Sequence, residues 1–73
     1  MKPKVKFDNK TNVVSVHCSI SDSKNIENLI RRFGIEITDT LNNEKETIFQ
    51  IKVIDKDEYK RFNSLWKSAK QFI

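Results

Sequence analysis

Residues 4–20 read KVKFDNKTNVVSVHCSI. Apolar and polar residues alternate on both sides of the polar stretch NKTN, which predicts two strands joined as a β-hairpin. Pairing Asp8 with Val13 across this four-residue loop puts the apolar residues of both strands on one face. Lys4 then lies opposite His17. We expect the two strands at about residues 3–8 and 13–21.

His17 and Cys18, the single histidine and the single cysteine of the chain, are neighbours in the second of these strands. Consecutive side chains of a strand point to opposite faces, so His17 is expected to face outward with Ser15 and Ser19. The inward set is Val14, Val16, Cys18 and Ile20. His17 and Cys18 therefore cannot act together as a base and a nucleophile, and Cys18 is typical of a small buried hydrophobic residue.

A helix and a second pair of strands follow. Asp22 is a suitable N-cap for a helix at residues 23–33, and Gly34, the single glycine, is expected to end it. The next strands are expected at residues 35–41 and 46–54.

The loop between these strands determines which residues face each other. A two-residue turn at 42–43 would set Ile35 opposite Gln50, whereas a three-residue loop sets Ile35 opposite Ile51, with Leu41 on the same inward side. We therefore expect a loop of odd length with one asparagine at positive φ.

The last helix is expected at residues 56–72. Asp55 and Glu58 have the spacing of a capping box, and Ile54 is placed to contact Tyr59 as a hydrophobic staple. One wide apolar stripe is expected to pack on the sheet. It comprises Tyr59, Phe62, Leu65, Trp66, Ala69, Phe72 and Ile73.

The element order is thus ββαββα, which predicts a single α+β domain over residues 1–73. We expect a four-stranded, largely antiparallel sheet with two helices on one face and the other face open. A shift of 33 residues superimposes the two halves and brings Asp22 onto Asp55. Either an internal duplication or the shared amphipathic pattern alone explains this match. The lysines of the first strand suit a sheet edge.

Composition limits the classes of protein to which the chain can belong. It has 73 residues, a net charge of +4 and one cysteine, so no internal disulfide can form. A chain that relies on packing alone suits a reducing compartment, and we expect a cytoplasmic protein. No apolar run is long enough to span a membrane. Lys, Asn and Ile make up 27 of the 73 residues, a bias typical of AT-rich genomes such as those of low-GC bacteria and their phages.

The motifs of common catalytic sites are missing from the sequence. A single glycine excludes the Walker loop and the dinucleotide-binding fingerprint. One histidine and one cysteine on opposite faces cannot make a four-ligand zinc site within one chain. Ser15, His17 and Asp8 would share a flat surface with no oxyanion hole. We therefore expect a protein that is not an enzyme and has no catalytic residues, metal or cofactor.

Two surfaces are available for binding. The first is the open sheet face, on which we expect a partner-binding site at Lys4, Lys6, His17 and Lys52. Its other members are expected to include Lys2, Asp8, Val13, Ser15, Ser19, Glu36, Thr38, Thr40, Ile48 and Gln50. The pattern puts no aromatic residue there, which disfavours base stacking of the kind seen on RNA-binding sheets. A surface that is merely solvated is the simpler explanation.

The second surface is a stripe on the solvent side of the last helix. Its candidate anion-binding residues are Lys56, Lys60, Lys67 and Lys70. Such a stripe can track phosphates, although it can also serve only to keep a small protein soluble.

From these observations we expect a small, phage-like or mobile-element protein that modulates or inhibits a host or defence protein by surface docking. Its partner is expected to present an acidic surface, and a homodimer is compatible with the sequence. The alternative is a nucleic-acid-binding regulator that uses the lysine stripe.

Overall fold

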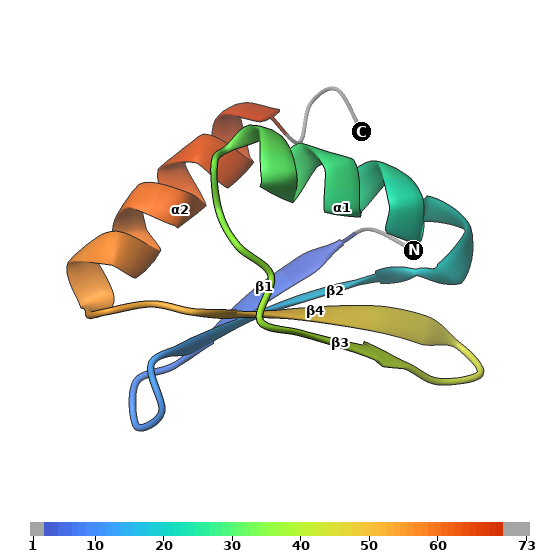
Figure 1. Cartoon of the computed structure of the whole chain (residues 1–73), viewed down its shortest axis with the longest axis horizontal. Coiled ribbons are helices and arrows are strands. Elements are labelled where there is room, and N and C mark those ends of the chain that lie inside the picture. Colours follow the sequence, from blue (N-terminus) through green and yellow to red (C-terminus); the bar gives the residue numbers. More distant parts are fainter. Residues whose placement is uncertain (1–2, 70–73) are drawn as a thin grey trace.

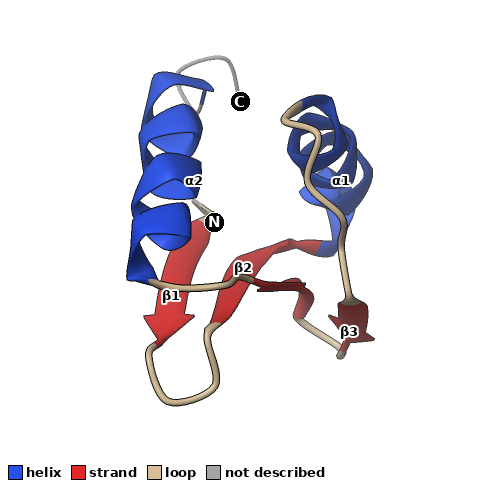
Figure 2. Ribbon diagram, turned by 60° about the vertical axis from the view of Figure 1, so that its left-hand side comes forward, coloured by secondary structure: helices blue, strands red, loops and turns tan. Residues whose placement is uncertain are grey.

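A computed structural model describes residues 3–69 and shows a four-stranded antiparallel sheet with two helices above one face (Figure 1). The elements are β1 (Lys4–Asp8), β2 (Val13–Ser19), the 3₁₀ turn η1 (Ile20–Asp22), α1 (Ser23–Arg32), β3 (Asp39–Asn42), β4 (Glu46–Lys52) and α2 (Lys56–Ala69). The predicted α+β class and ββαββα order are confirmed. No helix or strand covers the opposite face of the sheet in the described part of the chain (Figure 2).

The order of the strands is β1-β2-β4-β3, so β2 and β4 are central and β1 and β3 are edges. The β1–β2 register agrees with the prediction, with Asp8 opposite Val13 and Lys4 opposite His17. In the centre of the sheet, Val16 lies directly opposite Phe49. The lysine-bearing strand is an edge, as its sequence suggested.

The core lies between the sheet and the helices. Its buried residues are Val14, Val16, Cys18, Ile26, Ile30, Phe49, Ile51, Val53, Phe62 and Trp66. The ring of Phe7 on β1 stacks on that of Tyr59 on α2 with centroids 4.4 Å apart, which joins the sheet to the helix layer. Phe33, at the end of α1, meets Phe62 of α2 edge-on at 6.1 Å and joins the two helices.

The start of α1 differs from the prediction. The strand β2 ends at Ser19, two residues early, because the chain enters η1, and Ile20 is consequently 49% exposed instead of inward-facing. The carboxylate of Asp22 accepts a hydrogen bond from the Ser19 hydroxyl (3.0 Å) and caps no backbone N–H of α1. Gly34 ends the helix as predicted, with a φ of 76° and its N–H donating to the carbonyl of Arg31.

The second hairpin has a different register from the predicted one. The first strand covers only Asp39–Asn42, where residues 35–41 were expected, and Leu41 pairs with Ile48. Because Phe49 and Ile51 point inward, this pairing turns Leu41 outward, where it is 44% exposed. Ile35 and Ile37 pack against the core from an irregular segment that precedes β3.

The turn itself explains the change of register. The N–H of Asn43 donates to the carbonyl of Glu46, and the side-chain oxygen of Asn43 accepts the backbone N–H groups of Lys45 and Glu46, each at 2.8 Å. Three residues, 43–45, separate β3 from β4, an odd number as predicted. Asn42 nevertheless pairs with Thr47 and Leu41 with Ile48, so the predicted register is wrong. The non-glycine residue with positive φ in residues 3–69 is Asn12, in the first hairpin (φ 56°).

The last helix starts as predicted but packs differently. The N–H of Glu58 donates to the carboxylate of Asp55 (3.0 Å), so Asp55 is the N-cap. Ile54 is 80% exposed and forms no staple, because Tyr59 stacks on Phe7 instead. Leu65, predicted to be buried, is 41% exposed. The strand β4 ends at Lys52 instead of residue 54, and Phe72 and Ile73 lie outside the described residues.

Candidate docking surface on the open sheet face

The outward side chains of the four strands form the open sheet face. They alternate with the buried residues of β2 and β4 and are half-buried or exposed. The open sheet face consists of Lys4, Lys6, Asp8, Val13, Ser15, His17, Ser19, Asp39, Leu41, Glu46, Ile48, Gln50 and Lys52. The expected residues Glu36 and Thr38 precede β3, and Thr40 pairs with inward Phe49, so none of the three belongs to it. Lys2 lies outside the described residues.

The strand pairings arrange this face in rows that cross all four strands. One row contains Lys4, His17, Ile48 and Leu41, and the next contains Lys6, Ser15, Gln50 and Asp39. Ile48 and Leu41 are therefore neighbours, and they add apolar surface to one side of the face. Leu41 was not expected here, because its position depends on the β3–β4 turn.

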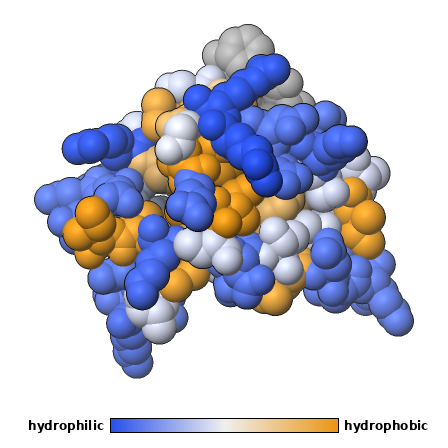
Figure 3. Space-filling view, in the orientation of Figure 1, coloured by the Kyte–Doolittle hydropathy of each residue, from blue (hydrophilic) through white to orange (hydrophobic). Residues whose placement is uncertain are grey.

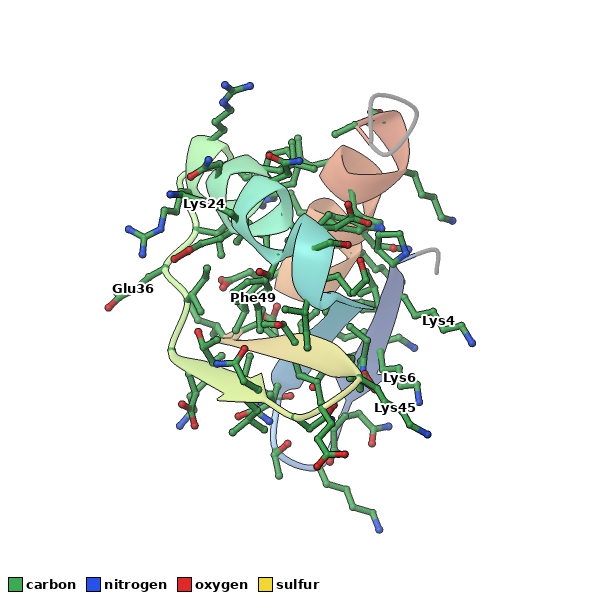
Figure 4. All side chains as sticks on the ribbon, turned by 90° about the vertical axis from the view of Figure 1, so that its right-hand side faces the viewer. Lys4, Lys6, Lys24, Glu36, Lys45 and Phe49 are labelled. Carbon is green, nitrogen blue, oxygen red and sulfur yellow. The ribbon has the colours of Figure 1, made fainter. Side chains whose placement is uncertain are left out.

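The predicted binding residues all lie on the open sheet face, but not as one cluster. Lys4, Lys6 and His17 are neighbours at the β1 side, and Figure 4 shows Lys4 and Lys6 extending from this edge while Phe49 points from β4 toward the helices. Lys52 is on β4 and lies opposite Val13, two strands away from β1. The structure therefore groups three of the four predicted residues.

His17 forms a contact that the sequence did not reveal. Its Nδ1 lies 2.7 Å from Oε1 of Glu46, and the two side chains are 21% and 27% exposed. Glu46 is the diagonal neighbour of His17, since His17 pairs with Ile48 two residues further along β4. This hydrogen bond to a carboxylate holds the imidazole ring in place on the sheet surface.

Cys18 lies on the other side of the same strand and is fully buried. Its thiol donates a weak hydrogen bond to the carbonyl of Thr47 (3.6 Å). Burial raises the pKa of this thiol above its ordinary value, and the carboxylates of Asp22 and Glu46 raise it further. Cys18 and His17 thus face opposite ways, as expected from their positions in the strand, and the thiol is held in its unreactive protonated form.

Charge is segregated on the open sheet face. The basic residues Lys4 and Lys6 lie on the edge strand β1, whereas the acidic residues Asp39 and Glu46 lie on β3 and β4. One further row has the opposite order of charge, because its Asp8 lies on β1 and its Lys52 on β4. The three lysines are balanced by three carboxylates, so the face has a basic side and an acidic side but no excess of positive charge.

The positive charge of the molecule resides instead in the helices. Seven basic and three acidic side chains belong to α1 and α2. Of the predicted stripe, Lys56, Lys60 and Lys67 are exposed on α2, and Lys70 lies outside the described residues. Within residues 3–69, the ion pairs are His17–Glu46 and Glu27–Arg31, so none of these three lysines has a carboxylate partner there.

Apolar residues reach the surface in separate patches among hydrophilic ones on the side shown in Figure 3. A shallow, open depression lies at the β3–β4 turn and is lined by Asn43, Glu44, Lys45 and Glu46. In the described residues, no three histidine, cysteine or carboxylate side chains converge to hold a metal ion. None of the helices described is long and apolar enough to cross a membrane.

The surfaces with binding potential are therefore the segregated open sheet face and the cationic helix layer. Comparison of the chain with protein-family models, with curated proteins and with solved structures found no match.

Proposed function

We propose that this protein is a small, non-enzymatic binding protein that docks on a protein partner through the open sheet face. The observation that carries the proposal is the uncovered face itself, which has a basic edge at Lys4 and Lys6 on β1 and apolar surface at Ile48 and Leu41 on β4 and β3. Protein interfaces usually combine apolar contacts with polar and charged ones.

The partner is proposed to be a host or defence protein that the chain modulates or inhibits by occupying a surface, in the manner of phage and mobile-element proteins. The AT-rich bias of the sequence supports this origin. The free, buried Cys18 suits a reducing compartment, so we propose that the protein acts in the cytoplasm.

Charge on the open sheet face specifies the chemistry of the partner. Lys4 and Lys6 favour an acidic surface opposite β1, whereas Asp39 disfavours one opposite the β3 side. Opposed potentials of this kind mainly control orientation and the rate of association. An acidic partner is therefore expected to contact the β1 side of the face. Lys52, on β4, is expected to make a further contact with this partner. His17 is already paired with Glu46, and it is proposed to contribute contact surface.

Affinity capture with matched charge reversals tests this proposal. The β1 double variant, Lys4→Glu with Lys6→Glu, reverses two charges on the open sheet face. The control double variant, Lys60→Glu with Lys67→Glu, makes the same change in net charge on α2. Capture from a nuclease-treated host lysate, followed by association kinetics with the captured protein, should show slower association for the β1 double variant alone. Equal slowing by both variants would mean that only net charge matters, and the assignment of the face would be wrong.

A second candidate function is nucleic-acid binding by the helix layer. The excess of seven basic over three acidic side chains in α1 and α2, with Lys56, Lys60 and Lys67 exposed, favours it. Binding through phosphates should be independent of sequence and weaken steeply with salt, and Lys60→Glu with Lys67→Glu should flatten that dependence. Absence of binding by the unmodified protein to unrelated DNA and RNA at low salt would eliminate this function.

A further inference from the structure

We propose that the open sheet face also binds a second copy of this chain and forms a weak two-fold dimer. The inference rests on the proposed role of this face as a protein-docking surface. It starts from the row that has Lys6 on the edge strand β1 and Asp39 on the edge strand β3, because such a row is complementary to itself when one copy is reversed.

The rows of the sheet allow this complementarity to be examined residue by residue. Lys6 and Asp39 are the two ends of one row, with Ser15 and Gln50 between them. Lys4 and Leu41 are the two ends of the adjacent row. Each row therefore has a basic end on β1 and a different end on β3.

Two directions of the two-fold axis in the plane of contact can be compared. An axis that runs across the strands at the level of Lys6 places β1 on β1 and β3 on β3 of the second copy, so that Lys6 meets Lys6 and Asp39 meets Asp39, while Lys4 meets Asp8. An axis parallel to the strands keeps each row at its own level and reverses its ends. Lys6 then faces Asp39 of the second copy, and Lys4 faces Leu41 of the second copy. Like charges disfavour the first arrangement, and the second is the one we infer.

The centre of the second arrangement is compatible with packing. His17 of one copy faces Ile48 of the second copy, and Ser15 faces Gln50, so a small side chain is matched with a larger one. The aliphatic stem of Lys4 covers Leu41, which is 44% exposed in the isolated chain. A small, largely polar contact of this kind gives a transient dimer, with a dissociation constant on the order of 100 μM.

Such a dimer would compete with the proposed partner for the same face. The open sheet face is then occupied by a second copy at high concentration and is released when a tighter partner binds.

Sedimentation velocity tests the dimer, at protein concentrations from about 10 μM to about 1 mM and in low salt, where surface charge pairs are least screened. Lys6→Glu and Asp39→Lys each turn two attractive pairs into repulsive ones. Each should weaken the dimer about tenfold. The matched controls are Lys60→Glu on α2 and Glu36→Lys, which lies before β3, and both should leave the dimer unchanged.

Mixing the two variants gives the sharpest result. In an equimolar mixture, Glu at position 6 of one variant faces Lys at position 39 of the other, and the native Lys6 faces the native Asp39. The mixture should therefore regain the dimer that each variant loses alone, while circular dichroism shows that both are folded. A protein that stays monomeric at about 1 mM, or a dimer that the controls weaken equally, would overturn the inference. So would a mixture that does not recover.

The two proposals can fail separately. A monomeric protein whose capture of a partner depends on Lys4 and Lys6 would remove the dimer and leave the docking function. If the dimer shows the expected charge pairs but capture of a partner does not respond to these lysines, the dimer stands and the docking function is removed.

Discussion

The two ββα halves of the molecule have the same order but differ at their edges. The central strands β2 and β4 start 33 residues apart, as do α1 and α2, and Val16 lies opposite its equivalent Phe49. These pairs are related by an approximate two-fold axis that passes through the centre of the sheet. The edge strands differ, because β1 buries Val5 and Phe7 partly, whereas β3 is short and fully exposed. The central strands and the helices are thus alike in the two halves, whereas the edge strands differ.

The difference between the halves arises from their turns. In the first hairpin, Asn12 adopts positive φ, and its carbonyl accepts the N–H of Val53, so the loop is tied to the segment before α2. In the second, the Asn43 side chain closes a local turn. One asparagine therefore contributes its backbone conformation and the other its side chain, and the same residue type has a different effect on register.

The largest expected effect compares the equivalent core positions. Phe49→Ala should lower the free energy of unfolding by about 3–5 kcal/mol, because the ring is 2% exposed and leaves a cavity between the sheet and both helices. Val16→Ala, which removes two methyl groups at the opposite position, should cost about 2 kcal/mol. Urea unfolding followed by circular dichroism measures both, and equal losses would contradict the larger buried contribution of position 49.

Cys18→Ser should cost about 2 kcal/mol, since a hydroxyl replaces a thiol that is fully buried beside Thr47. Cys18→Ala is the control for loss of the polar group. Neither change should prevent partner binding, because Cys18 faces away from the open sheet face.

The raised pKa of the Cys18 thiol predicts a dependence on pH. The folded state keeps the proton longer than the unfolded state, so this stabilisation is complete below the ordinary thiol pKa and is lost as the pH rises through the folded value. The stability of the native protein should therefore fall more than that of Cys18→Ala as the pH rises above the ordinary thiol pKa. Parallel curves for the two proteins in urea titrations would contradict the shift.

The two turns can be compared by one substitution in each. Asn43→Ala should cost about 1–2 kcal/mol, because two backbone N–H groups lose their acceptor. Asn12→Gly, which keeps positive φ accessible, should cost less than Asn12→Ala, which leaves a Cβ in the left-handed region without the polar side chain that lets asparagine adopt it. Thermal unfolding monitored by circular dichroism gives the order of the three variants, and Asn12→Gly should be the most stable.

The smallest effect concerns the two equivalent aspartates. Asp55→Ala should cost about 1 kcal/mol, because Asp55 caps α2 by accepting the N–H of Glu58. Asp22→Ala should cost less, since Asp22 bonds only the Ser19 hydroxyl and caps no backbone group of α1. Similar losses in chemical denaturation would show that the two helix starts are equivalent after all.

The candidate surface could be predicted only in part. The placement of Lys4, Lys6 and His17 follows from alternation and from the length of the first loop, both of which are local. The neighbours of these residues depend on β2 pairing with β4, which joins segments about 30 residues apart. Glu46 beside His17 therefore could not be derived from any local pattern. Leu41 beside Ile48 depends instead on the β3–β4 turn, whose register was predicted wrongly.

What the sequence by itself determined is the set of elements, the face that each central strand buries and the start of α2. These features depend on periodicity, on the capping of Asp55 and on the conformational freedom of Gly34, and all of them act within a few residues. The β3 register depends on the hydrogen bonds of the Asn43 side chain within its own turn. The tertiary structure alone decided the strand order and the exposure of Ile20, Ile54 and Leu65. Each of these reflects a competition between apolar residues for a core too small to hold them all, and in a chain of 73 residues the central strands and the aromatic contacts of α2 take that space first.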